Sequence, residues 1–143
     1  MKIFTIGFTK TTARSFFGRL KNAGVRRVVD VRLNNVSQLA GFAKRDDLAY
    51  FTEALCGADY KHRPELAPTQ GILDAYKKQK GDWGLYEQQF LDLMGKRKIE
   101  EIDPAELDGG CLLCSEDTPH HCHRRLVAEY LREKWGNLEI IHL

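Results

Sequence analysis

Short apolar runs alternate with helical patterns along this chain, and this alternation limits the folds that it can adopt. The run at 2–7 is followed by a helical pattern over 13–23 and then by a second apolar run at 25–31. A strand, a helix and a strand joined by short connections form a unit whose two strands are parallel. The sequence therefore predicts an α/β domain of the Rossmann or flavodoxin type, with an open, mainly parallel sheet of about four or five strands and helices on both faces.

The alternation continues to the last residues. At 143 residues the chain is long enough for one domain with a single core, so we expect one α/β domain over 1–143. After a polar loop at 33–38, the expected elements are a helix at 47–56 with Asp46 as its cap and Gly57 at its end, a short strand at 59–62, helices at about 72–79 and 85–98, an acidic connector at 100–108, a strand at 111–114, a helix from Pro119 to about Trp135, and a closing strand at 138–143.

The stretch from 111 to 125 holds most of the reactive side chains. Three of the four cysteines and three of the five histidines lie in it. Thr118 can cap a helix, and Pro119 suits the first helical position, where its missing N–H is no loss. Residues spaced by four lie on the same side of a helix. This spacing predicts that Cys122 and His123 begin the side of the helix that is buried.

Polar residues and glycine follow the four expected strands that precede the closing strand. In an open parallel sheet, ligands bind beyond the carboxyl ends of the strands. The residues at this edge are Gly7 and Thr9 after the first strand, Asp30 and Arg32 at the second, His62 and Arg63 at the third, and Cys114 and Glu116 at the fourth. We expect these four segments to meet in one pocket.

Cys122 and Cys114 are the candidates for a nucleophile or a redox group. The positive end of the expected helix, with His123 and Arg124 nearby, favours the thiolate of Cys122. Glu116 and His123 can serve as general acid and base. The alternative is that these cysteines are packed and inert, because free cysteine is among the residues most often buried.

Zinc is a second chemistry that this stretch can support. The side chains that can bind it are Cys114, His120, His121, Cys122 and His123. Their spacing matches no common Cys-x2-Cys knuckle, and the histidines would point in different directions around a helix. We therefore predict no metal and no cofactor, and we keep a zinc-stabilised domain as an alternative.

Several basic residues can hold an anion. Arg32 and Arg124 are expected to do so, the latter beside the free N–H groups at the helix start. Asp30 lies two residues before Arg32 on the same face of the strand, so it can either orient a substrate or brace the following loop through an ion pair. Basic residues close to an aromatic ring also suit phosphate and base recognition. Such residues are Lys44 and Arg45 near Phe42, and His62 and Arg63 near Tyr60.

Charge is unevenly distributed along the chain. Residues 1–63 hold 12 Lys and Arg against 5 Asp and Glu, whereas the remainder holds 10 against 15. A basic first half can present a positive face to a phosphate-bearing partner, either an anionic small molecule or a nucleic acid. Uneven charge is also common in soluble domains that bind neither, so the pattern alone does not identify a partner.

The sequence contains no apolar run of the length that a membrane span requires. Its first residues also lack the apolar region and cleavage site of a secretory signal. We therefore expect an intracellular, cytoplasmic protein without membrane contact, whose cysteines are reduced.

Three motifs stand out: Thr5-Ile6-Gly7, Val29-Asp30-Val31-Arg32, and Leu112-Leu113-Cys114-Ser115-Glu116 followed by Pro119 and Cys122-His123-Arg124. They resemble the motifs of domain-of-unknown-function family 488 (DUF 488). The resemblance covers nearly the whole chain. It implies a small α/β domain in which these motifs gather in one pocket, and it implies no established reaction.

The chain departs from that family in two places. Many members carry Gly-His-Ser where this chain has Gly7-Phe8-Thr9, so no histidine can act there in this protein. Many members also have a proline soon after the Asp-x-Arg motif, which Leu33-Asn34-Asn35 replaces here. The strand Val29-Asp30-Val31-Arg32 is similar to one in rhodanese-like sulfurtransferases, although their compact catalytic loop has no counterpart at 111–125.

These observations favour an enzyme that acts on a phosphate-bearing ligand, either a nucleotide or a nucleic acid. In this hypothesis Arg32 and Arg124 hold the anion, and Cys122 or Cys114 reacts with it. The residues expected to move protons or orient the ligand are Glu116, His123 and Asp30. The alternatives are a non-catalytic module that binds nucleotides or nucleic acid, a zinc-stabilised domain and a sulfurtransferase-like protein.

Overall fold

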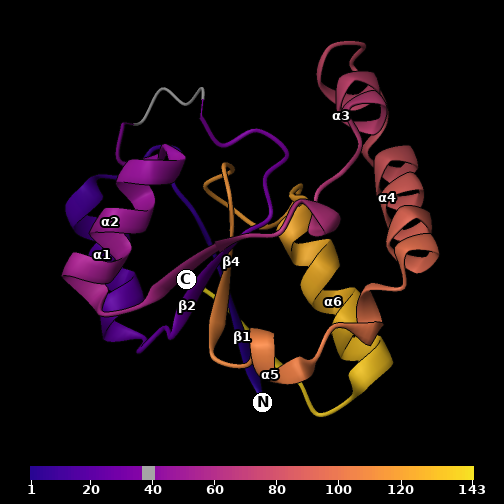
Figure 1. Ribbon diagram of the computed structural model, residues 1–143. Coiled ribbons are helices and arrows are strands. Elements are labelled where there is room, and N and C mark those ends of the chain that lie inside the picture. Colours follow the sequence, from indigo (N-terminus) through magenta and orange to yellow (C-terminus); the bar gives the residue numbers. More distant parts are fainter. Residues whose placement is uncertain (37–40) are drawn as a thin grey trace.

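The structure is a computed structural model that describes residues 1–36 and 41–143 (Figure 1). Within these ranges, five parallel strands form one sheet in the order β3-β2-β4-β1-β5. The strands are β1 (Lys2–Gly7), β2 (Arg27–Asp30), β3 (Asp59–His62), β4 (Gly110–Cys114) and β5 (Glu139–His142). The open parallel sheet expected from the alternation is confirmed. In the expected polar loop at 33–38, the last two residues lie outside the described part.

Six α-helices connect and cover these strands in the described part of the chain. They are α1 (Ala13–Asn22), α2 (Arg45–Cys56), α3 (Gln70–Lys77), α4 (Trp83–Arg97), α5 (Pro104–Leu107) and α6 (His123–Trp135). Short 3-10 turns occupy Gly41–Ala43, Pro64–Leu66 and Ile99–Glu101. None of these helices has the length and apolar character needed to cross a membrane.

Helices lie on both faces of the sheet, α1 and α2 on one and α3, α4 and α6 on the other (Figure 1). The central strand β4 is buried along its whole length. Because side chains alternate along a strand, Cys111 and Leu113 pack toward α1 and α2, whereas Leu112 and Cys114 pack toward α4 and α6. This alternation places the last cysteine of β4 on the α6 side.

Local signals account for most of the element boundaries. Thr12 accepts a hydrogen bond from the backbone N–H of Ser15 and caps α1, as a threonine at this position can. Gly57 ends α2 with a φ of 64°, a conformation that glycine adopts without a steric cost. The prediction that Asp46 caps α2 is wrong, because this helix begins at Arg45 and Lys44 precedes it.

The start of α6 differs most from the expectation. The helix begins at His123, four residues after Pro119, and Cys122 stands at its N-cap without a capping side-chain hydrogen bond. Residues 115–122 form bends and turns instead. Proline is compatible with a turn as well as with a first helical turn, and here contacts with the end of β1 hold the segment in an irregular path.

The connections from neighbouring strands leave the sheet in opposite directions. The chain passes from β1 into α1 on one face, and from the adjacent β4 into α6 on the other. Strands that diverge in this way leave a crevice beyond their carboxyl ends, where ligands of open α/β sheets bind. The fold therefore places a crevice at the end of β4.

Candidate functional site

A cleft of about 240 Å³ opens at the carboxyl ends of β2 and β4. Three parts of the chain line it: the segment after β2, the segment from the end of β4 to the start of α6, and the α3–α4 pair with the residues that precede it. The lining residues are Arg32, Leu33, Asn34, Pro68, Leu73, Tyr76, Lys77, Trp83, Tyr86, Cys114, Ser115, Glu116, His121, Cys122 and His123. Five of the predicted site residues therefore meet in one cleft: Arg32, Cys114, Glu116, Cys122 and His123.

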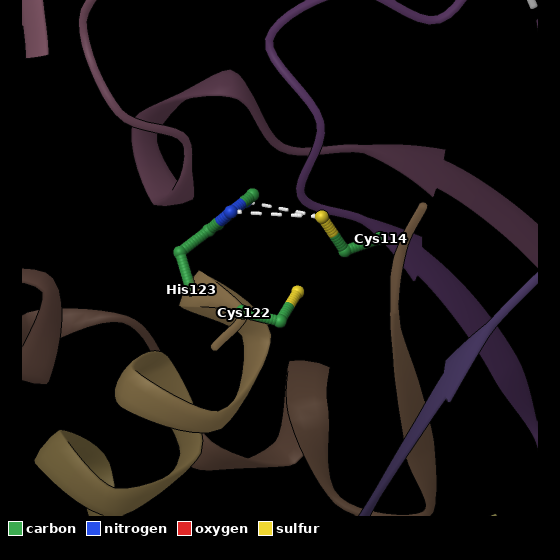
Figure 2. Close-up of side chains that lie close together, drawn as sticks. All are labelled: Cys114, Cys122 and His123. Carbon is green, nitrogen blue, oxygen red and sulfur yellow. Dashed lines mark hydrogen bonds between the residues drawn. The ribbon is translucent and has the colours of Figure 1, made fainter. Parts of the chain in front are cut away.

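Two thiols and an imidazole form the innermost part of the cleft. Cys114 at the end of β4 faces Cys122 and His123 at the start of α6, and the ligand atoms of these residues lie within 4.8 Å of one another (Figure 2). The Cys114 sulfur lies 3.6 Å from Nδ1 of His123. The three side chains are only 5%, 2% and 7% exposed, in chain order of the residues, so their interactions are weakly screened by water.

A backbone carbonyl fixes the hydrogen position on the His123 ring. Nε2 lies 2.6 Å from the carbonyl oxygen of Val31, which can only accept a hydrogen bond. Nε2 must therefore carry the hydrogen, so Nδ1 of the neutral ring is bare. The Cys114 sulfur lies over the ring, 3.6 Å from Nδ1 and 3.9 Å from Nε2. His123 can thus take a proton from the thiol, and its lone pair could equally bind a metal.

The two thiols have opposite shifts in pKa. The pKa of Cys114 is lowered, chiefly by its interaction with the thiol of Cys122. The backbone N–H and hydroxyl of Ser115 and the charge of Arg124 also lower this pKa, whereas burial of the thiol opposes the shift. The pKa of Cys122 is raised by burial and by its interaction with Cys114. The structure thus gives the lower pKa to Cys114, and Cys122 is a buried N-cap residue beside it. The expectation that one of these two thiols is the nucleophile stays a prediction.

Arg32 reaches the cleft with one nitrogen atom uncommitted. Its Nε and Nη2 each donate to a different oxygen of Asp30 at 2.8 Å, a bidentate pair that is almost completely buried. Nη1 is buried and has no hydrogen-bond partner among the described residues. Buried polar atoms are nearly always paired, and of the five unpaired ones among the described residues only this nitrogen belongs to a side chain that lines the cleft.

Asp30 orients Arg32 and does not line the cleft. It is fully buried, and it accepts hydrogen bonds from the Arg32 backbone at 3.1 Å and from the Tyr60 hydroxyl at 2.5 Å, in addition to the guanidinium. Of the two interpretations of the Asp30–Arg32 pair, the internal ion pair is the one formed. His62 supports it from β3, because its Nε2 lies 2.7 Å from the Arg32 carbonyl oxygen.

Aromatic side chains from α3 and α4 line another part of the cleft, and the sequence analysis did not predict that they would. The ring of Trp83 stacks on His121 at a centroid distance of 4.8 Å and on Tyr86 at 4.9 Å, and Tyr76 meets it edge-on. Lys77 at the end of α3 pairs with Glu116 at 2.8 Å. The carboxylate expected to act beside His123 is thus paired with a lysine.

Gly7, Thr9 and Arg124 support the cleft and do not line it. The backbone N–H and the hydroxyl of Thr9 both donate to the Ser115 carbonyl, at 3.0 and 2.5 Å. Arg124, 1% exposed, donates through Nη1 to the Glu116 carbonyl at 2.7 Å. These contacts hold the segment after β4 over the end of β1, where Gly7 leaves room for it.

The other basic candidates lie outside the cleft. Arg45 pairs with Asp46 on the surface, and Lys44 precedes α2 as its N-cap. Arg63 pairs with Glu65 and Glu106. The residues predicted to bind a ligand that do not line the cleft are Gly7, Thr9, Lys44, Arg45, His62, Arg63 and Arg124.

Comparison with known proteins places the chain in a family. No curated protein and no solved structure matched it. A family model described as "Domain of unknown function DUF488" matches residues 12–131, which include the Asp30–Arg32 pair and the whole Cys114–His123 segment. Since the match spans most of the 143 residues, the chain belongs to the DUF488 family, as its motifs predicted.

Proposed function

We propose that the protein is an enzyme that uses the Cys114 thiol to act on a small phosphate-bearing molecule of about mononucleotide size. The observation that carries this proposal is the arrangement in one cleft of a buried thiol–imidazole pair and an arginine nitrogen without a partner. A nucleophile, a base and an oriented cation are the groups that thiol-based group transfer to or from an anion requires.

The reaction follows from the hydrogen-bond pattern. The Cys114 proton passes to the bare Nδ1 of His123, and the thiolate then attacks the electrophilic atom of the substrate. A bond forms between sulfur and that atom while the bond to the leaving group breaks, and the leaving group takes the proton from Nδ1. Water cleaves the sulfur-bound intermediate and restores the thiol. Cys122, whose sulfur lies within 4.8 Å of the Cys114 sulfur, supports the attack because its interaction with Cys114 favours the thiolate of that residue.

The lining of the cleft favours a phosphate and a planar ring. Arginine binds phosphate through its fork of donors, and Nη1 of Arg32 is the free donor. The aromatic side chains of Tyr76, Trp83 and Tyr86 line the same cleft, and bases pack against side chains of this type. With a volume of about 240 Å³ the cleft suits one small molecule better than a nucleic acid strand.

Alkylation of each cysteine as a function of pH tests the nucleophile. In chelator-treated protein, we expect iodoacetamide to react with Cys114 with a midpoint below the value of about 8.5 of an ordinary cysteine, because its lowered pKa leaves more thiolate at a given pH. Cys122, whose pKa is raised, should stay unmodified until the protein unfolds. Peptide mapping by mass spectrometry assigns each rate.

The Cys122→Ala variant is the internal control for this measurement. It removes the thiol that chiefly lowers the pKa of Cys114, so the alkylation midpoint of Cys114 should move to higher pH, while Cys56 keeps its own profile. A Cys114 that reacts only on unfolding would refute the nucleophile. If phosphate binding persisted in that case, the non-catalytic binding module would be favoured.

Substitution of Arg32 by lysine tests the anion contact. The ammonium can still pair with Asp30, but the free Nη1 is lost, so we expect inorganic phosphate and adenosine monophosphate to bind roughly 10- to 100-fold more weakly, the usual effect of one charge-assisted hydrogen bond. Calorimetry on the folded variant measures this. Arg63→Lys is the matched control, because Arg63 already has two carboxylate partners outside the cleft. Equal phosphate affinity in Arg32→Lys and the wild type would contradict the assignment.

A further inference from the structure

The proposed reaction does not fully explain why Cys122 lies where it does. A thiol–imidazole pair needs one sulfur and one ring, yet a second sulfur is buried against both of them. The Cys114, Cys122 and His123 ligand atoms come from the end of β4 and the start of α6, and all lie within 4.8 Å of one another (Figure 2).

We propose that Cys114, Cys122 and His123 form a binding site for one zinc ion, with a fourth coordination position open to the cleft. Zinc binds thiolate sulfur and imidazole nitrogen, and sites with three protein ligands keep the fourth position for water or another ligand. In this site the ligands would be the two sulfur atoms and Nδ1 of the histidine.

The distances fit a tetrahedral ion. Zinc–sulfur and zinc–nitrogen bonds of about 2.3 and 2.0 Å place a sulfur and a nitrogen ligand about 3.5 Å apart. The Cys114 sulfur and Nδ1 of His123 are 3.6 Å apart. No pair in the group exceeds 4.8 Å, so the largest adjustment needed to close the site is about 1 Å.

The surroundings of the histidine also match a metal ligand. A metal-bound histidine almost always donates its other ring N–H to a carbonyl or carboxylate, which fixes the ring and its tautomer. Nε2 of His123 does this to the Val31 carbonyl at 2.6 Å. The lone pair of Nδ1 is therefore available to an ion. The Cys114 sulfur lies 3.6 Å from Nδ1 and 3.9 Å from Nε2, over the face of the ring, so the ring would have to tilt to bind the ion.

Charge and ligand type select the ion. Two thiolates and Zn²⁺ sum to zero, so the ion can be buried without an unpaired charge. The three donors are sulfur and nitrogen, which suit zinc, whereas magnesium and calcium require oxygen ligands. Zinc would bind the lone pairs that Cys114 and His123 need for the proposed reaction. The bound ion would therefore prevent the thiol from reacting with the substrate. The zinc site itself does not depend on that reaction.

The test is a zinc titration of the full chain after chelator treatment, under reducing conditions and in competition with a chromophoric chelator. We expect one equivalent to bind. Cys122→Ser should weaken binding by more than about 100-fold, since loss of an outer partner of a metal-bound histidine alone costs roughly 10- to 100-fold. Cys56→Ser, the same substitution outside the site, should bind as the wild type does. Absence of stoichiometric binding, or equal affinity in Cys122→Ser, would overturn the site.

A second measurement on the wild type needs no variant to fold. Zinc should slow alkylation of Cys114 at least tenfold and leave the rate of Cys56 unchanged; an unchanged Cys114 rate in the presence of saturating zinc would overturn the site. The two proposals fail separately. Reactive Cys114 without zinc binding overturns the zinc site alone, whereas zinc binding with an unreactive Cys114 in metal-free protein supports the site and refutes the reaction.

Discussion

Replacement of Gly7 by alanine is expected to destabilise the protein by about 3 kcal/mol or more, above the usual cost of an overpacked core position. An added Cβ would lie 1.6 Å from the Glu116 carbonyl oxygen and 2.6 Å from its carbon. Both atoms are backbone, so no side-chain rotation can relieve the clash. The segment after β4 would have to leave the end of β1 and give up its hydrogen bonds with Thr9. Urea unfolding followed by circular dichroism measures the loss.

The matched control is Gly18→Ala in α1. Nothing lies within 4 Å of a Cβ at this position, and glycine inside a helix is less stable than alanine by about 0.5–1 kcal/mol, so this variant should be slightly more stable than the wild type. Neither glycine has a positive φ, so both substitutions are compatible with the backbone. A Gly7→Ala variant as stable as the wild type would show that the segment does not cross β1 this closely.

Replacement of Asp30 by alanine is expected to cost about 3–5 kcal/mol, the usual effect of removing one partner from a buried ion pair. Asp30 and the side chain of Arg32 are 0% and 4% exposed, so the guanidinium would keep its charge without a partner and with little water. The hydroxyl of Tyr60 would also lose its acceptor. Thermal and urea unfolding report the stability, and phosphate binding should fall with it, because Arg32 would no longer be held in place.

Two comparisons test the cause of this loss. Asp46→Ala removes the partner of Arg45 at the surface and should cost less than about 1 kcal/mol, because water replaces the exposed pair. The double variant Asp30→Ala, Arg32→Met removes the unpaired charge and should recover part of the stability that the single variant loses. If the double variant were instead less stable than Asp30→Ala, the buried charge would not be the cause.

Much of the fold could be predicted from short-range patterns. The apolar runs and the rows spaced by four residues predicted the strands of the sheet and the main helices, with boundaries that differ by a few residues from those observed. The prediction that the segments after the strands meet at one edge succeeded for Arg32, Cys114, Glu116, Cys122 and His123, which line the cleft. Periodicity was sufficient here because a parallel sheet gathers the carboxyl ends of its strands.

The aromatic lining of the cleft could not be predicted in this way. Tyr76, Lys77 and Trp83 precede β4 by some thirty residues and reach the cleft only because α3 and α4 pack over its open side. Nothing in their local sequence distinguishes them from ordinary surface or core residues of two helices. Their role depends on the packing of these helices against the sheet, which no local pattern encodes.

The sequence by itself determined the parallel α/β architecture, membership of the DUF488 family and the proximity of Cys114 to the start of α6. Only the tertiary structure decided where α6 begins, which of the two thiols has the lower pKa and which nitrogen of Arg32 is left without a partner. The physical reason is that the two kinds of property depend on interactions of different range along the chain. Backbone preferences act over a few neighbouring residues, whereas a pKa or an unpaired donor depends on every atom around it, including atoms that distant segments bring there.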